Sequence, residues 1–392
     1  MRTYDVIVVG GGIIGTATAF ELARESLNVV LLDRHEPGLE ATWAAAGMLS
    51  PAPDAEDAEP LVPFARQSHA LYPDFISAIE EASGTPVEFQ RCGALEVFFS
   101  PHGEVERDHR IARIRSYGVT ADAISLSEAL RKEPLLNPAA QAVAWLPDEA
   151  YVDPRNLTQV ALAAAKNSGV EIRPATEVVS IFTSENQSSC GGVLAADSKA
   201  MKAGRMDVRT GEKIHARSIV IAAGSFSGNI GWIERYAPTH PVRGQMAALR
   251  CAEGTLRCIL RSDKGYVVPR KDGRIVAGST LENAGFKKQV TPGDLGKVLR
   301  AAIELAPALE NAAITETWSG LRPGTPDQLP IIGPTDVEGL FIATGHYRNG
   351  ILLAPATAKC ISTWILDGMS PIPVENFSPM RLAAAAYLAG RQ

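Results

Sequence analysis

Three glycines near the start of the chain, Gly10, Gly12 and Gly15, have the spacing of a dinucleotide-binding turn. They lie between a short apolar run and a stretch, 16–26, that is typical of a helix. In such a turn the glycines permit a tight bend, close approach of a pyrophosphate, and packing of the helix on the strand. The N–H groups at the start of the helix then face the phosphates. Because Asp33 ends a second apolar run, where a ribose diol would be bound, the sequence predicts a dinucleotide site rather than an ordinary glycine turn.

A segment rich in glycine, proline, alanine and acids, 36–60, is predicted to be a loop. It contains the small residues AAAGM at 44–48, on which a flat ligand could lie closely. A plain surface connection is the alternative, but surface loops seldom need such an apolar cluster. We therefore expect this loop to contact the bound ligand.

The rest of the chain alternates between helical and strand patterns, which predicts an α/β fold. Asp153 followed by Pro154 is a typical helix start. Lys271-Asp272-Gly273 predicts the turn of a hairpin that spans 265–277 and has Tyr266 on one face. Helices are expected at 64–82, 154–167, 293–305 and 351–366, and strands at 87–100, 170–173, 177–183, 217–223, 241–249, 315–321 and 340–344.

The α/β pattern of the first segment resumes after residue 148, so the first domain is predicted to be interrupted. We expect an α/β chain (α+β overall) in which a second domain, with a large antiparallel or mixed sheet, is inserted into a Rossmann-like domain. Segment 184–216 is the least regular and is interpreted as a loop-rich hairpin extension. The Rossmann-like domain comprises 1–86, 148–236 and 319–392, and the second domain 87–147 and 237–318.

Composition and charge argue against several classes of protein. The net charge of −6 over 392 residues provides no basic surface for nucleic acid or anionic lipid. The longest uncharged apolar stretch, 6–20, is too short to span a membrane. Five cysteines without a CxxC motif and seven scattered histidines predict neither a disulfide framework nor a metal site. The cysteine pattern favours a reducing, cytoplasmic location. We expect no signal peptide, because the fold begins near Tyr4.

Five motifs together resemble the D-amino-acid oxidase family of flavoproteins, and specifically its glycine oxidase branch of the thiamin pathway. They are GGGIIG at 10–15, AAAGM at 44–48, AAG at 222–224, GLRPGT at 320–325 and GHYRNGILLAPATA at 345–358. The resemblance covers nearly the whole chain and implies FAD rather than NAD. The Rossmann-like domain would then bind FAD and the inserted domain the substrate.

The resemblance also implies which residues hold FAD. Backbone N–H groups at the start of the helix after Asn349 would stabilise negative charge on the flavin ring. Composition leaves a histidyl link at His35 or His346 open, whereas the resemblance favours non-covalent FAD. The implied set is Gly10, Gly12, Ile13, Ile14, Gly15, Asp33, Arg34, Thr42, Ala45, Ala46, Gly47, Met48, Val178, Ala223, Gly224, Gly320, Arg322, His346, Arg348, Asn349, Gly350, Ile351 and Leu352.

For the reaction, the resemblance implies a small amino-acid substrate whose carboxylate is bound by Arg322, with the Tyr266 hydroxyl as a second donor. Arg348 matches the other active-site arginine of the family, with a salt bridge or helix-entry contact as the alternative; Tyr266 could instead be a core aromatic. Hydride transfer to flavin N5 needs no general base. The products would be a 2-oxo acid, ammonia or an amine, and, after reaction with molecular oxygen, hydrogen peroxide.

The expected substrates are glycine, sarcosine and small D-amino acids, with a role in forming the thiazole of thiamin. Met48 is expected to line the substrate pocket, and three other pocket residues depart from the family pattern. Lys264 stands in place of a histidine, Leu281 in place of a methionine, and Ser50 in place of a smaller residue. Lys264 would either favour a second negative charge on the substrate or simply be solvated.

Two other functions stay open from the residues. One is a related dehydrogenase of sarcosine, proline, D-amino acids or a 2-hydroxy acid that passes electrons to an acceptor other than oxygen. The other is a flavin-bearing partner protein with a vestigial site. Family resemblance implies a homo-oligomer, often a tetramer. The charge and hydropathy of the chain predict no nucleic-acid or membrane partner.

Overall fold

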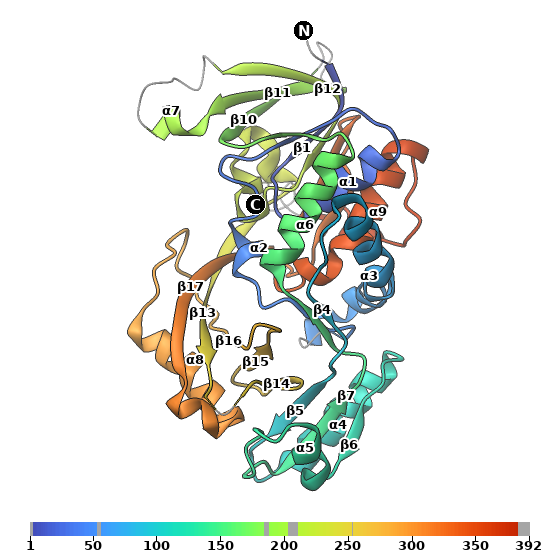
Figure 1. Ribbon diagram of the computed structural model, residues 1–392. Helices are drawn as coiled ribbons and strands as arrows, with labels where there is room; N and C mark the ends of the chain where they lie inside the picture. Colours follow the sequence, from blue (N-terminus) through green and yellow to red (C-terminus); the bar gives the residue numbers. More distant parts are fainter. Residues whose placement is uncertain (1–2, 53–55, 184–187, 203–210, 253, 383–392) are drawn as a thin grey trace, which may run out of the picture.

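The computed structural model describes residues 3–52, 56–183, 188–202, 211–252 and 254–382. Figure 1 shows two large sheets, one in the upper and one in the lower part of the view, with most of the longer helices beside the upper sheet. No helix in these ranges is long and apolar enough to cross a membrane. The mixed helix and sheet architecture confirms the predicted fold class.

The first sheet is built on a parallel centre that starts with the glycine-bearing strand. Its central strand β1 pairs in parallel with β2 and β12, while β10 and β11 extend the edge beyond β12 in antiparallel fashion. The strand order is β10-β11-β12-β1-β2-β9, with β19 pairing to β12 and β18 to β19. The strands are β1 (Thr3–Val9), β2 (Val29–Leu32), β9 (Glu171–Arg173), β10 (Thr176–Thr183), β11 (Cys190–Asp197), β12 (Glu212–Ile221), β18 (Ile331–Pro334) and β19 (Leu340–Thr344).

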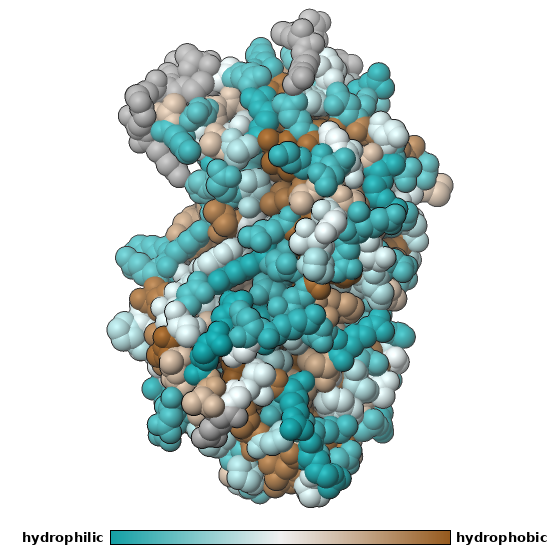
Figure 2. Space-filling model, in the orientation of Figure 1, coloured by the Kyte–Doolittle hydropathy of each residue, from teal (hydrophilic) through white to brown (hydrophobic). Residues whose placement is uncertain are grey.

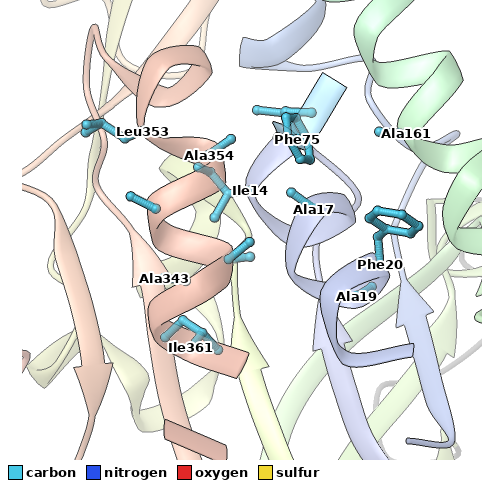
Figure 3. Packing of buried hydrophobic residues seen from close by; sticks show 14 of the residues in the cluster. Ile14, Ala17, Ala19, Phe20, Phe75, Ala161, Ala343, Leu353, Ala354 and Ile361 are labelled. Atoms are coloured by element: carbon cyan, nitrogen blue, oxygen red, sulfur yellow. The ribbon is translucent and has the colours of Figure 1, made fainter. Parts of the chain in front are cut away.

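Helix α1 (Ile13–Arg24) is buried almost all round, because α9 (Gly350–Asp367) and α6 (Pro154–Asn167) pack against it. Small residues such as Ala17 of α1 and Ala354 of α9 let these helices approach closely, as Figure 3 shows. Helix α3 (Val62–Ser83) packs on both α6 and α9. This packing fixes where α1 and α9 begin.

The second sheet is mixed: β14 and β5 are parallel, and its other neighbours are antiparallel. It has the strand order β17-β13-β16-β15-β14-β5-β7-β6. The strands are β5 (Ala94–Phe98), β6 (Asp122–Ile124), β7 (Ala142–Leu146), β13 (His240–Arg250), β14 (Ile259–Arg261), β15 (Tyr266–Pro269), β16 (Ile275–Gly278) and β17 (Ala313–Gly324). Its helices are α4 (Gly103–Ser116), α5 (Leu126–Lys132) and α8 (Pro292–Leu305).

Short elements complete the described part of the chain. A three-stranded sheet has the order β3-β8-β4 and joins the two halves of the molecule. The short elements are α2 (Ala41–Ala44), α7 (Ser198–Lys202), β3 (Met48–Leu49), β4 (Phe89–Gln90), β8 (Ala150–Val152), and the 3₁₀ helices η1 (Glu56–Leu61), η3 (Gly224–Asn229), η4 (Gly231–Arg235), η5 (Pro307–Asn311) and η6 (Glu375–Phe377).

Two expectations about local structure need correction. Segment 36–60 is not a plain loop, because it contains α2, β3 and η1. Segment 184–216 is less loop-rich than expected, because β11 pairs with β10 over most of its length. Its residues 192–195 pair in antiparallel fashion with 212–215 of β12, as expected for a hairpin. Residues 184–187, 203–210 and 383–392 lie outside the described residues.

The two large sheets draw on segments that alternate along the chain. The predicted boundary at 319 falls within strand β17, whose residues 313–324 pair with β13 apart from one register shift between Ile314 and Glu316. The assignment of cofactor binding to one part and substrate binding to the other stays a prediction.

Candidate active site

One large cavity, with a volume of about 1130 Å³, is lined by residues from both large sheets and from the loop at 41–50. Most of the predicted site residues line it, including Asp33, Met48, Tyr266, Arg322 and Arg348. Gly15 and Leu352 are the exceptions among them. The fold therefore brings together residues that lie more than 300 positions apart in the sequence.

The glycine turn has the tight geometry that its spacing predicts. Gly10 has a φ of +105°, and a Cβ atom added there would lie 2.5 Å from the carbonyl oxygen of Ala222. A Cβ atom at Gly15 would lie only 1.9 Å from the carbonyl oxygen of Gly10. Gly15 therefore packs α1 onto the strand and does not itself line the cavity.

Donors and an acceptor face the cavity beside this turn. Among the described residues, the N–H groups of Gly12 and Ile14 have no protein acceptor, so they can bind phosphate oxygens. Asp33 accepts hydrogen bonds from the N–H groups of Gly11 and His35, each at 2.8 Å. Burial raises the pKa of the Asp33 carboxyl, although both hydrogen bonds oppose this. The donor set suits a pyrophosphate, and Asp33 suits a ribose diol.

The loop that carries AAAGM is fixed to the cavity wall at its beginning and middle. The Ile13 N–H donates to Thr42 Oγ1 at 3.1 Å, which ties the loop to the start of α1. Trp318 of β17 donates from Nε1 to the Ala44 carbonyl at 3.1 Å. These bonds join the loop to α1 and to β17 of the second sheet.

The end of the same loop is held by a buried cation. Arg270 donates from Nη2 to the Ala46 carbonyl at 2.6 Å, and its Nε lies 3.6 Å from Asp153 Oδ2. The Val152 N–H donates to the Gly47 carbonyl at 2.9 Å. Nothing in the sequence connected Arg270 with this loop.

A second helix start meets the cavity at α9, where Asn349, Gly350 and Ile351 line the wall. His346 is buried just before it, and its Nε2 lies 3.0 Å from Thr357 Oγ1. Burial lowers the pKa of His346 to about 3, so the ring is neutral at physiological pH. Leu352 points into the hydrophobic core instead of lining the cavity.

Arg322 lines the same cavity and is held by two hydrogen bonds. Its Nη1 donates to the Thr280 carbonyl at 3.1 Å and its Nη2 to Ser279 Oγ at 2.6 Å. In the described part of the chain, no carboxylate forms an ion pair with it. Burial lowers its pKa, and Arg348 adds to this effect, but a guanidinium stays charged in proteins. The site thus offers an oriented cation that lacks an anionic partner.

Tyr266 and Arg348 also line the cavity and affect the pKa of Arg322. The Tyr266 hydroxyl lies 3.6 Å from Met246 Sδ, and its proximity opposes the lowering of the Arg322 pKa. Arg348 is exposed, with its guanidinium carbon 5.3 Å from the centre of the Tyr347 ring. Within the described ranges it forms no ion pair, so the salt-bridge alternative finds no support there.

The three residues that depart from the family pattern all line the cavity. The Ser50 hydroxyl donates to Glu149 Oε1 at 2.6 Å. Lys264 lies 2.6 Å from Glu304 Oε1, which raises the lysine pKa, and its side chain is 55% exposed. Leu281 lines the cavity and is also half exposed. Because Glu304 balances its charge, Lys264 is better described as solvated than as a site for a second substrate charge.

Sequence reasoning missed a buried group of charges beside Ser50. Glu96 accepts from Arg110 Nε at 3.0 Å and from Arg261 Nη2 at 2.7 Å. Arg261 Nη1 lies 3.2 Å from Glu149 Oε1. The available signal was Glu96, an acid within an apolar strand pattern, but its partners come from α4 and β14.

Comparisons with known proteins identify the family. A family model described as FAD dependent oxidoreductase (DAO) matches residues 5–364. The chain belongs to this family. It is 32% identical to a glycine oxidase of Pseudomonas putida over 375 residues, which cover 94% of this chain and 96% of that protein. It is 35% identical over 389 residues to a bifunctional ThiO/ThiG protein of Synechocystis sp., of which it spans 54%.

The fold matches the same relatives. The structure of glycine oxidase from Geobacillus kaustophilus superposes with a TM-score of 0.88 at 29% identity, over 97% of this chain and 99% of that one. The predicted family, enzyme class and cofactor are confirmed: the chain is an FAD-dependent oxidoreductase of the glycine oxidase type. The chain spans about half the length of the bifunctional relatives.

The residues that line the cavity suit the chemical groups of FAD. Free N–H donors lie at the start of α1, Asp33 stands at the end of β2, and the fixed AAAGM loop provides a flat wall of small residues. The described residues contain no cluster of three histidine, cysteine, aspartate or glutamate side chains that could hold a metal ion. The roles of the individual residues toward FAD stay predictions.

Proposed function

We propose that this protein oxidatively deaminates glycine and other small amines, including sarcosine and small D-amino acids. The observation that supports this most strongly is the guanidinium of Arg322, which faces the cavity without a carboxylate partner among the described residues. A buried cation of this kind favours an anionic ligand, because binding supplies the counter-charge that the protein lacks.

The orientation of Arg322 suits a carboxylate. Ser279 and Thr280 each occupy one N–H of a terminal nitrogen, so one N–H remains on each nitrogen. A substrate carboxylate that accepts both would be held in a plane, and the Tyr266 hydroxyl would fix it further. The α-carbon would then have one defined direction toward the cofactor, which is how orientation contributes to rate.

The chemical balance is that of an amine oxidation. FAD, when bound, accepts the hydrogen and electron pair that leave the α-carbon. The resulting imine hydrolyses, so glycine, oxygen and water yield glyoxylate, ammonia and hydrogen peroxide. The N–H groups of Asn349, Gly350 and Ile351 at the start of α9 would stabilise negative charge on the flavin ring.

The relatives support a role in thiamin formation. The relatives that this chain covers almost completely are glycine oxidases, and the bifunctional ones are ThiO/ThiG proteins. We further propose that FAD is bound non-covalently, because the ring of His346 is buried against Thr357. A cytoplasmic location and a homo-oligomer, with a tetramer as the family expectation, also stay predictions.

The test is anaerobic mixing of the purified flavoprotein with glycine, sarcosine, D-alanine and D-proline, while the visible flavin absorbance is followed. Bleaching by glycine and recovery on admission of air, with peroxide formed, is the expected result. Bleaching without recovery in air would indicate a dehydrogenase with another electron acceptor. No bleaching by any of the four amines would overturn the proposed substrate class.

A further inference from the structure

The loop between β16 and α8, residues 279–291, links the two ends of the cavity. Its first residues, Ser279 and Thr280, orient Arg322 at the substrate end. Its later residues Phe286 and Lys288 contact the part of the molecule built on the first sheet. Most of the loop is exposed to solvent. Arg243 of β13 and Ser319 of β17 hold its middle on the second sheet, and Phe286 and Lys288 tie it to the other part of the molecule.

Phe286 takes part in a three-layer stack. Its ring lies 4.6 Å from the ring of Phe226, measured between centroids, with an interplanar angle of 26°. The guanidinium carbon of Arg34 lies 3.3 Å from the centroid of Phe226. Two groups this close cannot share one face of a ring, so Phe226 is sandwiched between Phe286 and Arg34.

Lys288 is linked to Arg34 indirectly, through Glu40. Its ammonium pairs with Oε2 of Glu40, whose Oε1 lies 3.3 Å from Nη2 of Arg34. Glu40 also lies near the ring of His35. The loop therefore restrains Arg34 both through the stack and through a carboxylate.

Arg34 directly follows Asp33, and both residues line the cavity together with Phe226 and Val178. This is the end where the ribose and adenine of a dinucleotide would lie, since Asp33 directly follows β2. The restrained guanidinium and the Phe226 ring thus form part of the wall around the adenine nucleotide.

We propose that Phe286 and Lys288 form a clasp that holds the adenine-nucleotide half of FAD. The proposal rests on the predicted placement of FAD in this cavity. The clasp increases the affinity for FAD because it fixes Arg34 and Phe226 beside the adenylate. It makes no contact with the flavin half of the cofactor. The loop follows β16 of the second sheet, whereas Arg34 and Phe226 belong to the part built on the first sheet. FAD is therefore held between these two parts of the molecule.

The experiment compares the double variant Phe286→Ala, Lys288→Ala with the parent protein after FAD has been removed. Dissociation constants are measured by flavin fluorescence for FAD and for FMN, which lacks the adenylate. We expect the FAD dissociation constant to rise roughly tenfold and that of FMN to stay within twofold. The conservative variant Phe286→Tyr, Lys288→Arg should restore tight FAD binding.

The matched control is Ile314→Ala with Lys297→Ala. Ile314 is 51% exposed, comparable with 45% for Phe286, and the Lys297 ammonium pairs with Asp294 at 2.7 Å. Neither residue lines the cavity, so FAD affinity should not change.

Unchanged FAD affinity in the double variant would overturn the clasp. An equal loss of affinity for FAD and FMN would also overturn it, because such a loss would indicate general damage to the protein. The placement of FAD is tested separately with the variant Gly10→Ala. This variant should lose the FAD binding that the parent protein shows. If the parent binds FAD and Gly10→Ala binds it equally well, the predicted cofactor site fails, and the clasp fails with it.

Discussion

Replacement of Arg322 by methionine is expected to weaken substrate binding while the cofactor remains bound. Methionine has a similar length but no charge, and it cannot donate to a carboxylate. The two bonds that Arg322 makes to Ser279 and Thr280 would also be lost. Their loss is offset in part because a buried cation without a counter-ion is itself costly, so the variant should still fold.

The magnitude follows from the two N–H groups that remain for the substrate. Hydrogen bonds to charged groups contribute about 1.5–3 kcal/mol each, so two of them contribute about 3–6 kcal/mol. At about 1.4 kcal/mol for each factor of ten, kcat/KM for glycine should fall roughly 10²- to 10⁴-fold. Arg322→Lys keeps the charge but loses the paired geometry, and we expect an intermediate fall of about 10- to 100-fold.

The assay is anaerobic reduction of the bound flavin at a series of glycine concentrations, with oxygen uptake as a second readout. Arg217→Met, which removes an exposed arginine outside the cavity, is the control and should leave kcat/KM unchanged. Arg348→Met should cost about tenfold or less, because an exposed charge is screened by solvent. If Arg322→Met retained kcat/KM within threefold of the parent, the carboxylate assignment would be refuted.

Three further predictions concern the cofactor end and stability. Gly10→Ala should abolish FAD binding, because its Cβ would lie 2.5 Å from the Ala222 carbonyl oxygen at a φ of +105°; retention of FAD after gel filtration would contradict this. Arg270→Met should lower the free energy of unfolding by about 3 kcal/mol and weaken FAD binding, because a buried ion pair and the Ala46 contact are both lost; urea unfolding that superimposes on the parent curve would argue against this role. The pKa of His346 is about 3 in the folded protein and 6.5 as its ordinary value, so the unfolded state binds more protons between these limits and stability falls as pH decreases. At 1.36 kcal/mol per unit, the 1.5 units between pH 6.5 and 5 correspond to about 2 kcal/mol, which His346→Gln should abolish in unfolding measured against pH.

The local features of the site could be read from the sequence, because each depends on neighbours along the chain. The glycine spacing before α1 predicts a turn that only residues without a side chain can form, and Gly10 has the required positive φ. Asp153 caps α6 through the N–H groups of Arg155 and Asn156, as the Asp-Pro pair predicts. The hairpin turned by Lys271-Asp272-Gly273 pairs β15 with β16 as expected.

The face of this molecule shown in Figure 2 carries its hydrophobic residues in small groups among hydrophilic ones. That pattern agrees with the balanced composition, which constrains the surface as a whole but places no single residue. Helix α4 shows the same limit, because residues 103–116 form a helix that is not among those expected from the sequence.

The sequence by itself determined the family, the cofactor class and the turn that receives the phosphates, since these depend on short contiguous motifs. Only the tertiary structure decided that Arg270 holds the Ala46 carbonyl 224 positions away, or that Glu96 pairs with Arg261. It also brought Phe286 onto Phe226. These contacts join segments whose separation is set by sheet pairing and by which faces are buried. No local preference in the chain specifies such partners, because each side chain acquires its neighbours only when the two sheets are assembled.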